Sequence, residues 1–111
     1  MTKKELKESY KQLKFPIGVF QIRNTVTGKV FISSSVNLDA IWNRHHLQLK
    51  FGMHPNEKLQ ADWNAFGADN FLFEILDTIE QKGEERMDYA REVRKLEEMY
   101  KEELAAVKQL Y

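Results

Sequence analysis

The chain has 111 residues, of which 42% are apolar and 31% are charged, a composition typical of one small globular domain. It has no cysteine, which excludes disulfides and thiolate metal sites, and no apolar run approaches the length of a membrane span. The net charge is zero, which argues against a dedicated high-affinity DNA clamp, although residues 1–64 hold ten Lys/Arg and five Asp/Glu while residues 65–111 hold seven and twelve.

The N-terminal segment predicts a short amphipathic helix over residues 2–14. Thr2 and Glu5 have the spacing of a capping box, and Pro16 ends the helical pattern. The segment is charged and lacks the apolar stretch of a signal peptide, so we expect a cytoplasmic protein. We therefore describe residues 1–15 as a helical extension of a single domain that spans residues 1–111.

A hairpin follows, because the hydrophobic period changes from 3.6 to 2. Residues 19–23 and 29–34 are rich in β-branched and aromatic side chains, and Gly28 lies in the turn between them. We expect Phe20 to lie opposite Phe31, as a cross-strand aromatic pair. The alternative for these two rings is a platform on which nucleic-acid bases stack.

The next segment predicts a helix from Leu38 to about Lys50. Asn37 is a favourable N-cap, and Gly52 is suited to the C-terminal turn. One face of the helix carries an apolar stripe with a histidine in it, formed by Leu38, Ile41, Trp42, His45 and Leu49.

Three further elements complete the chain. Residues 59–66 predict a second helix closed by Gly67, with Trp63 as a packing anchor. Residues 71–79 form an apolar strand that we expect to be central or covered on both faces. After Gly83, residues 84 to about 108 predict a long charged helix, whose apolar face includes Met87, Ala90, Val93 or Arg94, Met99 or Tyr100, and Leu104. The order α-β-β-α-α-β-α predicts an α+β fold with a small three-stranded sheet flanked by helices.

Several short motifs in this order resemble the GIY-YIG nuclease domain. They are "GVF", "FIS", "SSVNLDAIWNRHH", "GMHPNEKLQADWNAFG", "FLFEIL" and "LEEMYKEEL", and they cover about residues 17–104. The resemblance implies a three-stranded antiparallel sheet surrounded by helices. It also implies cleavage of phosphodiester bonds, with a tyrosine acting on water, an arginine clamping the phosphate and a glutamate binding a divalent cation.

This chain departs from that pattern at the reactive positions. The GIY tyrosine falls on Phe20, the YIG tyrosine on Phe31, the YIG glycine on Ser33 and the clamp arginine on Ile41. What persists of the pattern is His45, His54 and Glu97, the last at the position of the metal glutamate. A positioned acid or base contributes roughly 10²–10⁴ to a rate, and one electrostatic donor roughly 10²–10³. The resemblance therefore points to a catalytically degenerate site.

Some residues could retain a role. Arg44 lies three residues past the clamp position and on nearly the same helix face, while His45 and His54 could assist catalysis or be structural. Glu97 could instead be an ordinary solvated helix position. No cofactor is expected with certainty, but Mg²⁺ or another divalent cation would be required if the site were active.

The partners follow from the same residues. The basic half of the chain leaves room for weak nucleic-acid binding, for which the candidate contacts are Arg23, Lys29, Arg44 and Lys50. Our main hypothesis is a degenerate nuclease-like domain that acts as a binding or regulatory module. The alternatives are an active divergent DNA or RNA endonuclease, with His45 or His54 as base, and a protein-interaction module without a nucleic-acid role.

Overall fold

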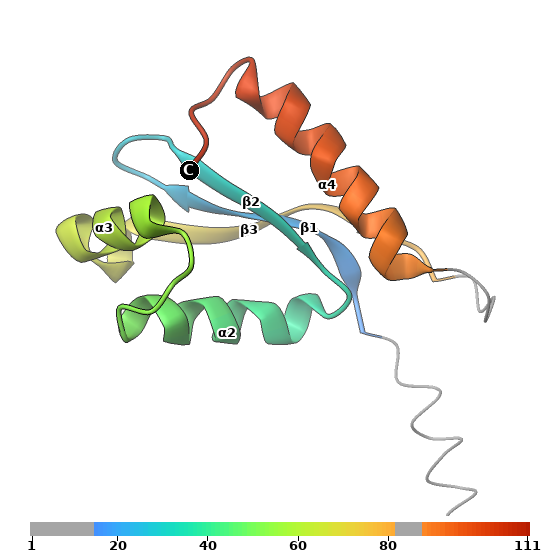
Figure 1. The fold of residues 1–111 in the computed structure, drawn as a ribbon, viewed down its shortest axis with the longest axis horizontal. Coiled ribbons are helices and arrows are strands. Elements are labelled where there is room, and N and C mark those ends of the chain that lie inside the picture. Colours follow the sequence, from blue (N-terminus) through green and yellow to red (C-terminus); the bar gives the residue numbers. More distant parts are fainter. Residues whose placement is uncertain (1–14, 82–87) are drawn as a thin grey trace, which may run out of the picture.

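The computed structural model describes residues 15–81 and 88–111, and within them an α+β domain whose sheet lies between helices (Figure 1). The strands are β1 (Ile17–Asn24), β2 (Val30–Ser35) and β3 (Phe71–Ile79), and the helices are α2 (Leu38–Lys50), α3 (Glu57–Phe66) and α4 (Tyr89–Ala105). The predicted fold class is confirmed. The predicted helix over residues 2–14 and the start of the last predicted helix lie outside the described residues. None of the described helices is long and apolar enough to cross a membrane.

The strand order is β2-β1-β3, and β1 is antiparallel to both neighbours. Every side chain of β1 except Arg23 is buried. Strand β3 is an edge strand of this sheet, and Leu72 and Ile75 on it are 44% and 53% exposed. The prediction that residues 71–79 would be central or covered on both faces was wrong, because the fully buried position belongs to β1.

The register of the hairpin also differs from the prediction. Phe20 lies opposite Ser33, and Phe31 lies opposite Ile22, so the two phenylalanines are not a cross-strand pair. Asn24 sets this register. Its side-chain oxygen accepts from the N–H of Val26 at 2.9 Å, its carbonyl accepts from Gly28 at 2.8 Å, and its own N–H donates to the carbonyl of Lys29 at 2.9 Å.

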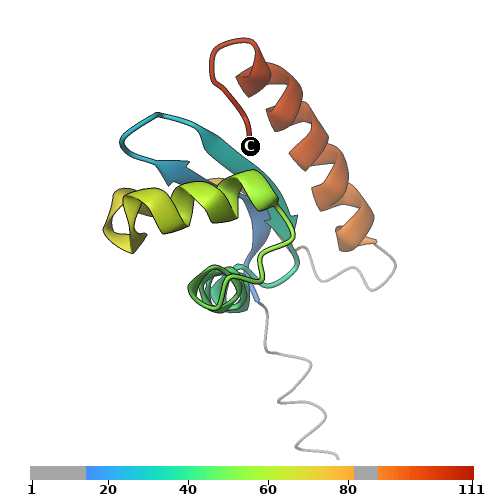
Figure 2. The same cartoon turned by 60° about the vertical axis from the view of Figure 1, so that its left-hand side comes forward.

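The two faces of the sheet carry separate hydrophobic cores (Figures 1 and 2). Helices α2 and α3 cover one face, where the buried residues are Phe20, Ile22, Leu38, Leu49, Leu59, Trp63 and Phe71. Helix α4 covers the other, where the buried residues are Ile17, Val19, Val30, Ile32 and Val93. The alternation of β1 thus divides its side chains between the two cores.

The spacing of apolar residues in the sequence largely predicted which helix faces pack on the sheet. The stripe on α2 and the anchoring role of Trp63 are confirmed. On α4, Val93, Tyr100 and Leu104 face the sheet as expected, but Leu96 also joins them. Met99 is exposed, so the choice between Met99 and Tyr100 is decided for Tyr100.

Strand β1 approaches β3 very closely at Gly18. A Cβ atom on Gly18 would lie 2.1 Å from the carbonyl oxygen of Asp77, so no other residue fits there without a backbone shift. Next to this contact the register skips Leu76, because Val19 pairs with Asp77 and Phe20 pairs with Ile75. This irregularity turns both Leu76 and Asp77 toward α4, where Leu76 packs and Asp77 accepts a hydrogen bond from the hydroxyl of Tyr100 at 2.9 Å.

Helix α2 begins and ends at the residues that its sequence indicates. The side chain of Asn37 accepts from the N–H of Ala40, and the C-cap is Phe51. Gly52 follows with φ +73°, and the N–H groups of Gly52 and Met53 donate to the carbonyls of Leu49 and Gln48. This pair of bonds is a Schellman motif, which fixes the path of the chain from α2 to α3.

The last residues of the chain pass beside β2. Leu110 forms a parallel bridge with Val30, and the N–H of Tyr111 donates to the carbonyl of Val30 at 3.0 Å. The hydroxyl of Tyr111 accepts from the side chain of Asn24 at 3.0 Å and donates to Asp62 at 2.6 Å. Tyr111 thereby connects the hairpin turn to α3.

Candidate functional site

A hollow of about 390 Å³ lies where β2, α2 and α4 meet. It contains three of the residues that sequence reasoning singled out, namely Ile41 and Arg44 from α2 and Glu97 from α4. The remaining lining residues are Ser34, Ser35, Val36, Ala90, Val93 and Arg94. Elements distant in sequence therefore place the expected clamp position and the expected metal glutamate at one site.

Both carboxylate oxygens of Glu97 contact a partner within the protein. The hydroxyl of Ser34 donates to Oε1 at 2.7 Å, and the ammonium of Lys101 lies 2.7 Å from Oε2. The Glu97 side chain is 14% exposed, so these two partners supply most of its polar contacts. Within the described residues there is no group of three His, Asp or Glu side chains that could hold a metal ion. Because a divalent cation needs several oxygen ligands, the donors present fit one poorly.

Phe20 and Phe31 lie on the face covered by α2, and the ring of His45 lies between them. The His45 ring centroid is 5.4 Å from that of Phe20 and 5.6 Å from that of Phe31, and His54 contacts the edge of Phe31 at 5.3 Å. Phe20 has no exposed surface, so it cannot stack on a base. The two rings form a packed cluster with the histidines instead of the predicted cross-strand pair.

The two histidines form a hydrogen-bonded chain whose protons can be assigned. The N–H of Asn56 donates to Nδ1 of His54 at 3.0 Å, so that nitrogen carries no proton. The neutral ring of His54 then carries its proton on Nε2 and donates it to Nδ1 of His45 at 2.8 Å. His45 in turn carries its proton on Nε2. In each ring, the one nitrogen without a proton therefore already accepts a hydrogen bond.

Burial keeps both rings neutral. Desolvation, followed by repulsion from His54 and Arg44, lowers the pKa of His45 to about 4. Desolvation also lowers the pKa of His54, against a smaller opposing effect of the Asn56 hydrogen bond. At neutral pH, His45 therefore offers a single N–H donor and no proton acceptor.

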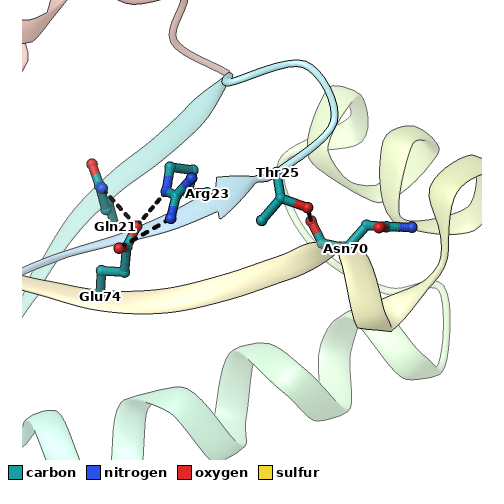
Figure 3. Close-up of polar contacts among 5 residues, drawn as sticks. All are labelled: Gln21, Arg23, Thr25, Asn70 and Glu74. Atoms are coloured by element: carbon teal, nitrogen blue, oxygen red, sulfur yellow. Dashed lines mark hydrogen bonds and ion pairs between the residues drawn. The ribbon is translucent and has the colours of Figure 1, made fainter.

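Two of the four candidate nucleic-acid contacts have partners inside the protein. Arg23 donates to Glu74 through Nε at 2.6 Å, and Gln21 donates to the same carboxylate at 3.0 Å (Figure 3). The hydrogen bond from Arg23 is the main cause that holds the pKa of the half-buried Glu74 below its usual value, and the Gln21 bond and the charge of Arg23 act in the same direction. The ammonium of Lys29 lies 5.8 Å from the ring centroid of Tyr111.

The other two candidate contacts, Arg44 and Lys50, are exposed. In the described part of the chain Arg44 has no ion pair, and the contact recorded for Lys50 is with the ring of Phe51 at 6.0 Å. The structure thus separates the four residues into a partly buried pair, Arg23 and Lys29, and an exposed pair on α2, of which Arg44 has no ion pair within the described residues.

Sequence reasoning missed three residues around Glu97. Lys101 lies four residues after Glu97 on a helix, a spacing that favours an ion pair and could have been noticed. Ser34 and Arg94 carry no such local signal, because the hollow exists only after α4 packs across β2.

Comparison with known proteins gives consistent results. No family model matches the chain. Over 50 residues, or 45% of its length, the chain is 38% identical to intron-associated endonuclease 1 of Enterobacteria phage T4, and the match spans a fifth (20%) of that protein.

Two solved structures of the catalytic domain of the homing endonuclease I-TevI share the fold. A mutant form is 27% identical with a TM-score of 0.69, over 82% of this chain and 86% of that one. The other structure is 28% identical with a TM-score of 0.67, over 85% of this chain and 96% of that one.

Proposed function

Because the chain belongs to the GIY-YIG nuclease superfamily, as a divergent member with GVF and FIS at the motif positions, we propose that it is a degenerate nuclease-like domain that acts as a binding or regulatory module. Its ligand in this proposal is nucleic acid, bound weakly. The observation that supports the proposal is the hollow that brings Ile41, the residue aligned with the phosphate clamp, together with Glu97.

The hydrogen bonds of the candidate general bases support the proposed loss of catalytic activity. A general base needs a free lone pair within reach of the water that it activates. The lone pairs of His45 and His54 already accept hydrogen bonds, and Phe20 and Phe31 have no hydroxyl. Glu97 is a carboxylate, but both of its oxygens are paired.

The cations that remain support binding. Arg44 and Arg94 line the hollow, and neither forms an ion pair within the described residues. Two guanidinium groups beside a shallow hollow can contact phosphate without any chemical step. Since few charges are involved and the net charge of the chain is zero, we expect the affinity to be low and to fall with salt in proportion to the few phosphates contacted.

The test is an assay of cleavage and binding with the purified chain. Plasmid, single-stranded DNA and RNA are incubated with Mg²⁺ or Mn²⁺, and binding of labelled oligonucleotides is followed by fluorescence anisotropy from low to high salt. We expect salt-dependent binding and no cleavage. Cleavage that is lost in Glu97→Ala but kept in the control Glu98→Ala would overturn the proposal, because Glu98 is the exposed neighbour that does not line the hollow. Cleavage that persists equally in both variants would come from a contaminating nuclease.

One observation favours a second candidate, an active but divergent endonuclease. Arg44 lines the same hollow as Glu97, so it could replace the missing clamp. In that case Arg44→Gln would abolish cleavage, and the same assay reveals it. A protein-interaction module, the third candidate, would show neither cleavage nor salt-dependent binding to any oligonucleotide.

A further inference from the structure

An exposed apolar patch lies at the C-terminal end of α2, outside the hollow. Leu47, Phe51 and Met53 are 51%, 67% and 75% exposed, and none of them packs against either core. Exposed apolar side chains that gather within a short segment of the chain are a feature of binding surfaces. We call these three residues the α2 patch.

The α2 patch is held on ordered backbone. The N–H of Phe51 donates to the carbonyl of Leu47 at 3.0 Å, and the Schellman bonds of Gly52 and Met53 continue the turn. The backbone of Phe51 is therefore ordered before a ligand binds, which lowers the entropy cost of binding.

The charged residues in the chain segment around the α2 patch are positive, and the nearest acidic residues in the sequence are Asp39 and Glu57. Residues 40–56 include Arg44 and Lys50 but no Asp or Glu. Arg44 has no ion pair among the described residues, and Lys50 lies 6.0 Å from the centroid of the Phe51 ring. The surface thus combines an exposed aromatic ring with two available cations, which suits a polyanion that carries flat apolar groups.

Helical spacing puts these groups in line. Arg44, Leu47 and Phe51 follow one another at intervals of three and four residues, so they share one flank of α2. The rise of the helix separates Arg44 from Phe51 by about 10 Å, which corresponds to about three stacked nucleotides. Because Arg44 also lines the hollow, a strand could run from the hollow to the α2 patch.

We propose that the α2 patch is a binding site for single-stranded nucleic acid, in which Phe51 stacks on an unpaired base and Arg44 and Lys50 contact the backbone phosphates. A duplex hides the faces of its bases, so only an unpaired strand can use the ring of Phe51. The inference rests on the proposed function, because it names the form of nucleic acid bound and the residues that bind it.

The experiment measures the affinity of the full chain for a labelled 12-nucleotide single strand and for the corresponding duplex at low salt. We expect the single strand to bind more tightly. Phe51→Ala should weaken its binding about 5- to 100-fold, the effect of losing one stacked base, while Phe51→Trp should preserve it. Met99→Ala is the matched control, since Met99 is 56% exposed on α4, away from the α2 patch. Circular dichroism and urea unfolding verify that each variant is folded.

The contribution of the Arg44 charge to binding is measured separately, by the salt dependence of the affinity. Arg44→Gln should weaken binding to all sequences and reduce the slope of log affinity against log salt by about one, and the control Arg91→Gln on α4 should not. Polyglutamate is the competitor that carries charge but no bases, and we expect it to displace the strand poorly.

Four results would overturn the inference. Equal affinity of Phe51→Ala and the unchanged chain for the single strand, or a preference for the duplex, would do so while leaving the proposed function intact. Polyglutamate binding with the same dependence on Phe51 would show that the α2 patch accepts an acidic protein segment instead. Absence of binding to every nucleic acid would overturn the proposed function together with this inference.

Discussion

Gly18 and Phe20 stand two residues apart on the central strand, and each is fixed by a neighbour on another element. Phe20 packs against His45 and Phe73, and Gly18 faces the carbonyl of Asp77. The sequence motif indicated that Phe20 replaces a tyrosine, but it did not indicate that its ring has no exposed surface. The requirement for glycine at position 18 was not predictable either, because the backbone that approaches it belongs to β3, more than fifty residues away in the sequence.

Gly18→Ala should destabilise the protein by at least about 1–3 kcal/mol. The added Cβ meets backbone, which cannot rotate away as a side chain can. Urea unfolding followed by tryptophan fluorescence measures the change.

The control for that variant is Gly28→Asn in the hairpin loop. There a Cβ meets nothing within 4 Å, and asparagine tolerates the left-handed backbone, so we expect a loss below about 1 kcal/mol. Equal losses in the two variants would contradict the role assigned to the Gly18–Asp77 contact.

At the scale of elements, local signals predicted what each segment is, and distant contacts decided where it lies. Asn37, Gly52 and Gly67 cap their helices as expected, because capping depends on a few adjacent residues. The edge position of β3 and the hairpin register were mispredicted. The register depends on three hydrogen bonds of Asn24, and the sheet order depends on which strand both helix layers cover.

Tyr111 is the residue through which the last segment connects to the hairpin turn and α3. Tyr111→Phe should cost about 1–3 kcal/mol of stability, because it leaves the side-chain N–H of the fully buried Asn24 without the acceptor it has now. Burial and the Asp62 hydrogen bond raise the pKa of Tyr111 to about 12, so the hydroxyl stays protonated throughout the measurement. Thermal unfolding by circular dichroism compares the variant with the unchanged chain.

Tyr100→Phe is the matched control, since the partner of Tyr100 is the partly exposed Asp77 and water can replace the lost bond. We expect the free energy of unfolding to fall less in this control than in Tyr111→Phe. If Tyr100→Phe lost more free energy of unfolding than Tyr111→Phe, the buried hydrogen bond between Tyr111 and Asn24 would contribute less to stability than we propose.

At the scale of the whole molecule, the sheet separates the expected catalytic residues into two environments. The aromatic and histidine cluster is enclosed between the sheet and α2, whereas Ile41, Arg44 and Glu97 meet at the hollow beside β2. Motif spacing selected Ile41, Arg44 and Glu97, which line one hollow in the structure, and their role as a site stays a prediction. It could not predict that the histidines bond to one another, since their contact depends on the turn between α2 and α3.

The free energy of unfolding should fall as the pH drops from about 6.5 toward 4. Both histidines have a lowered pKa in the folded state, so the unfolded chain binds more protons in this window and is favoured as the pH falls. Each histidine can contribute at most about 1.4 kcal/mol per pH unit. Glu74, whose pKa is lowered from 4.5, contributes only near and below that value.

Urea unfolding at pH 7, 6 and 5 measures this dependence. The variant His45→Asn keeps an acceptor for the N–H of His54 but removes one titrating ring, so its slope should be shallower. An unchanged slope in His45→Asn would show that burial does not hold His45 neutral in the folded protein.

The central place of β1 also bears on how the chain reaches this fold. The β1–β2 hairpin joins neighbouring segments, but β1 and β3 pair Asn24 with Phe71 and Ile17 with Ile79, and the intervening chain must be gathered first. Closing such a long loop costs conformational entropy before the β1–β3 contacts can stabilise it, so this non-local pairing slows folding. We therefore expect the hairpin to form early, with α2 and α3 collapsing onto it. Strand β3 should join late, which leaves the unpaired side of β1 open to other strands until then.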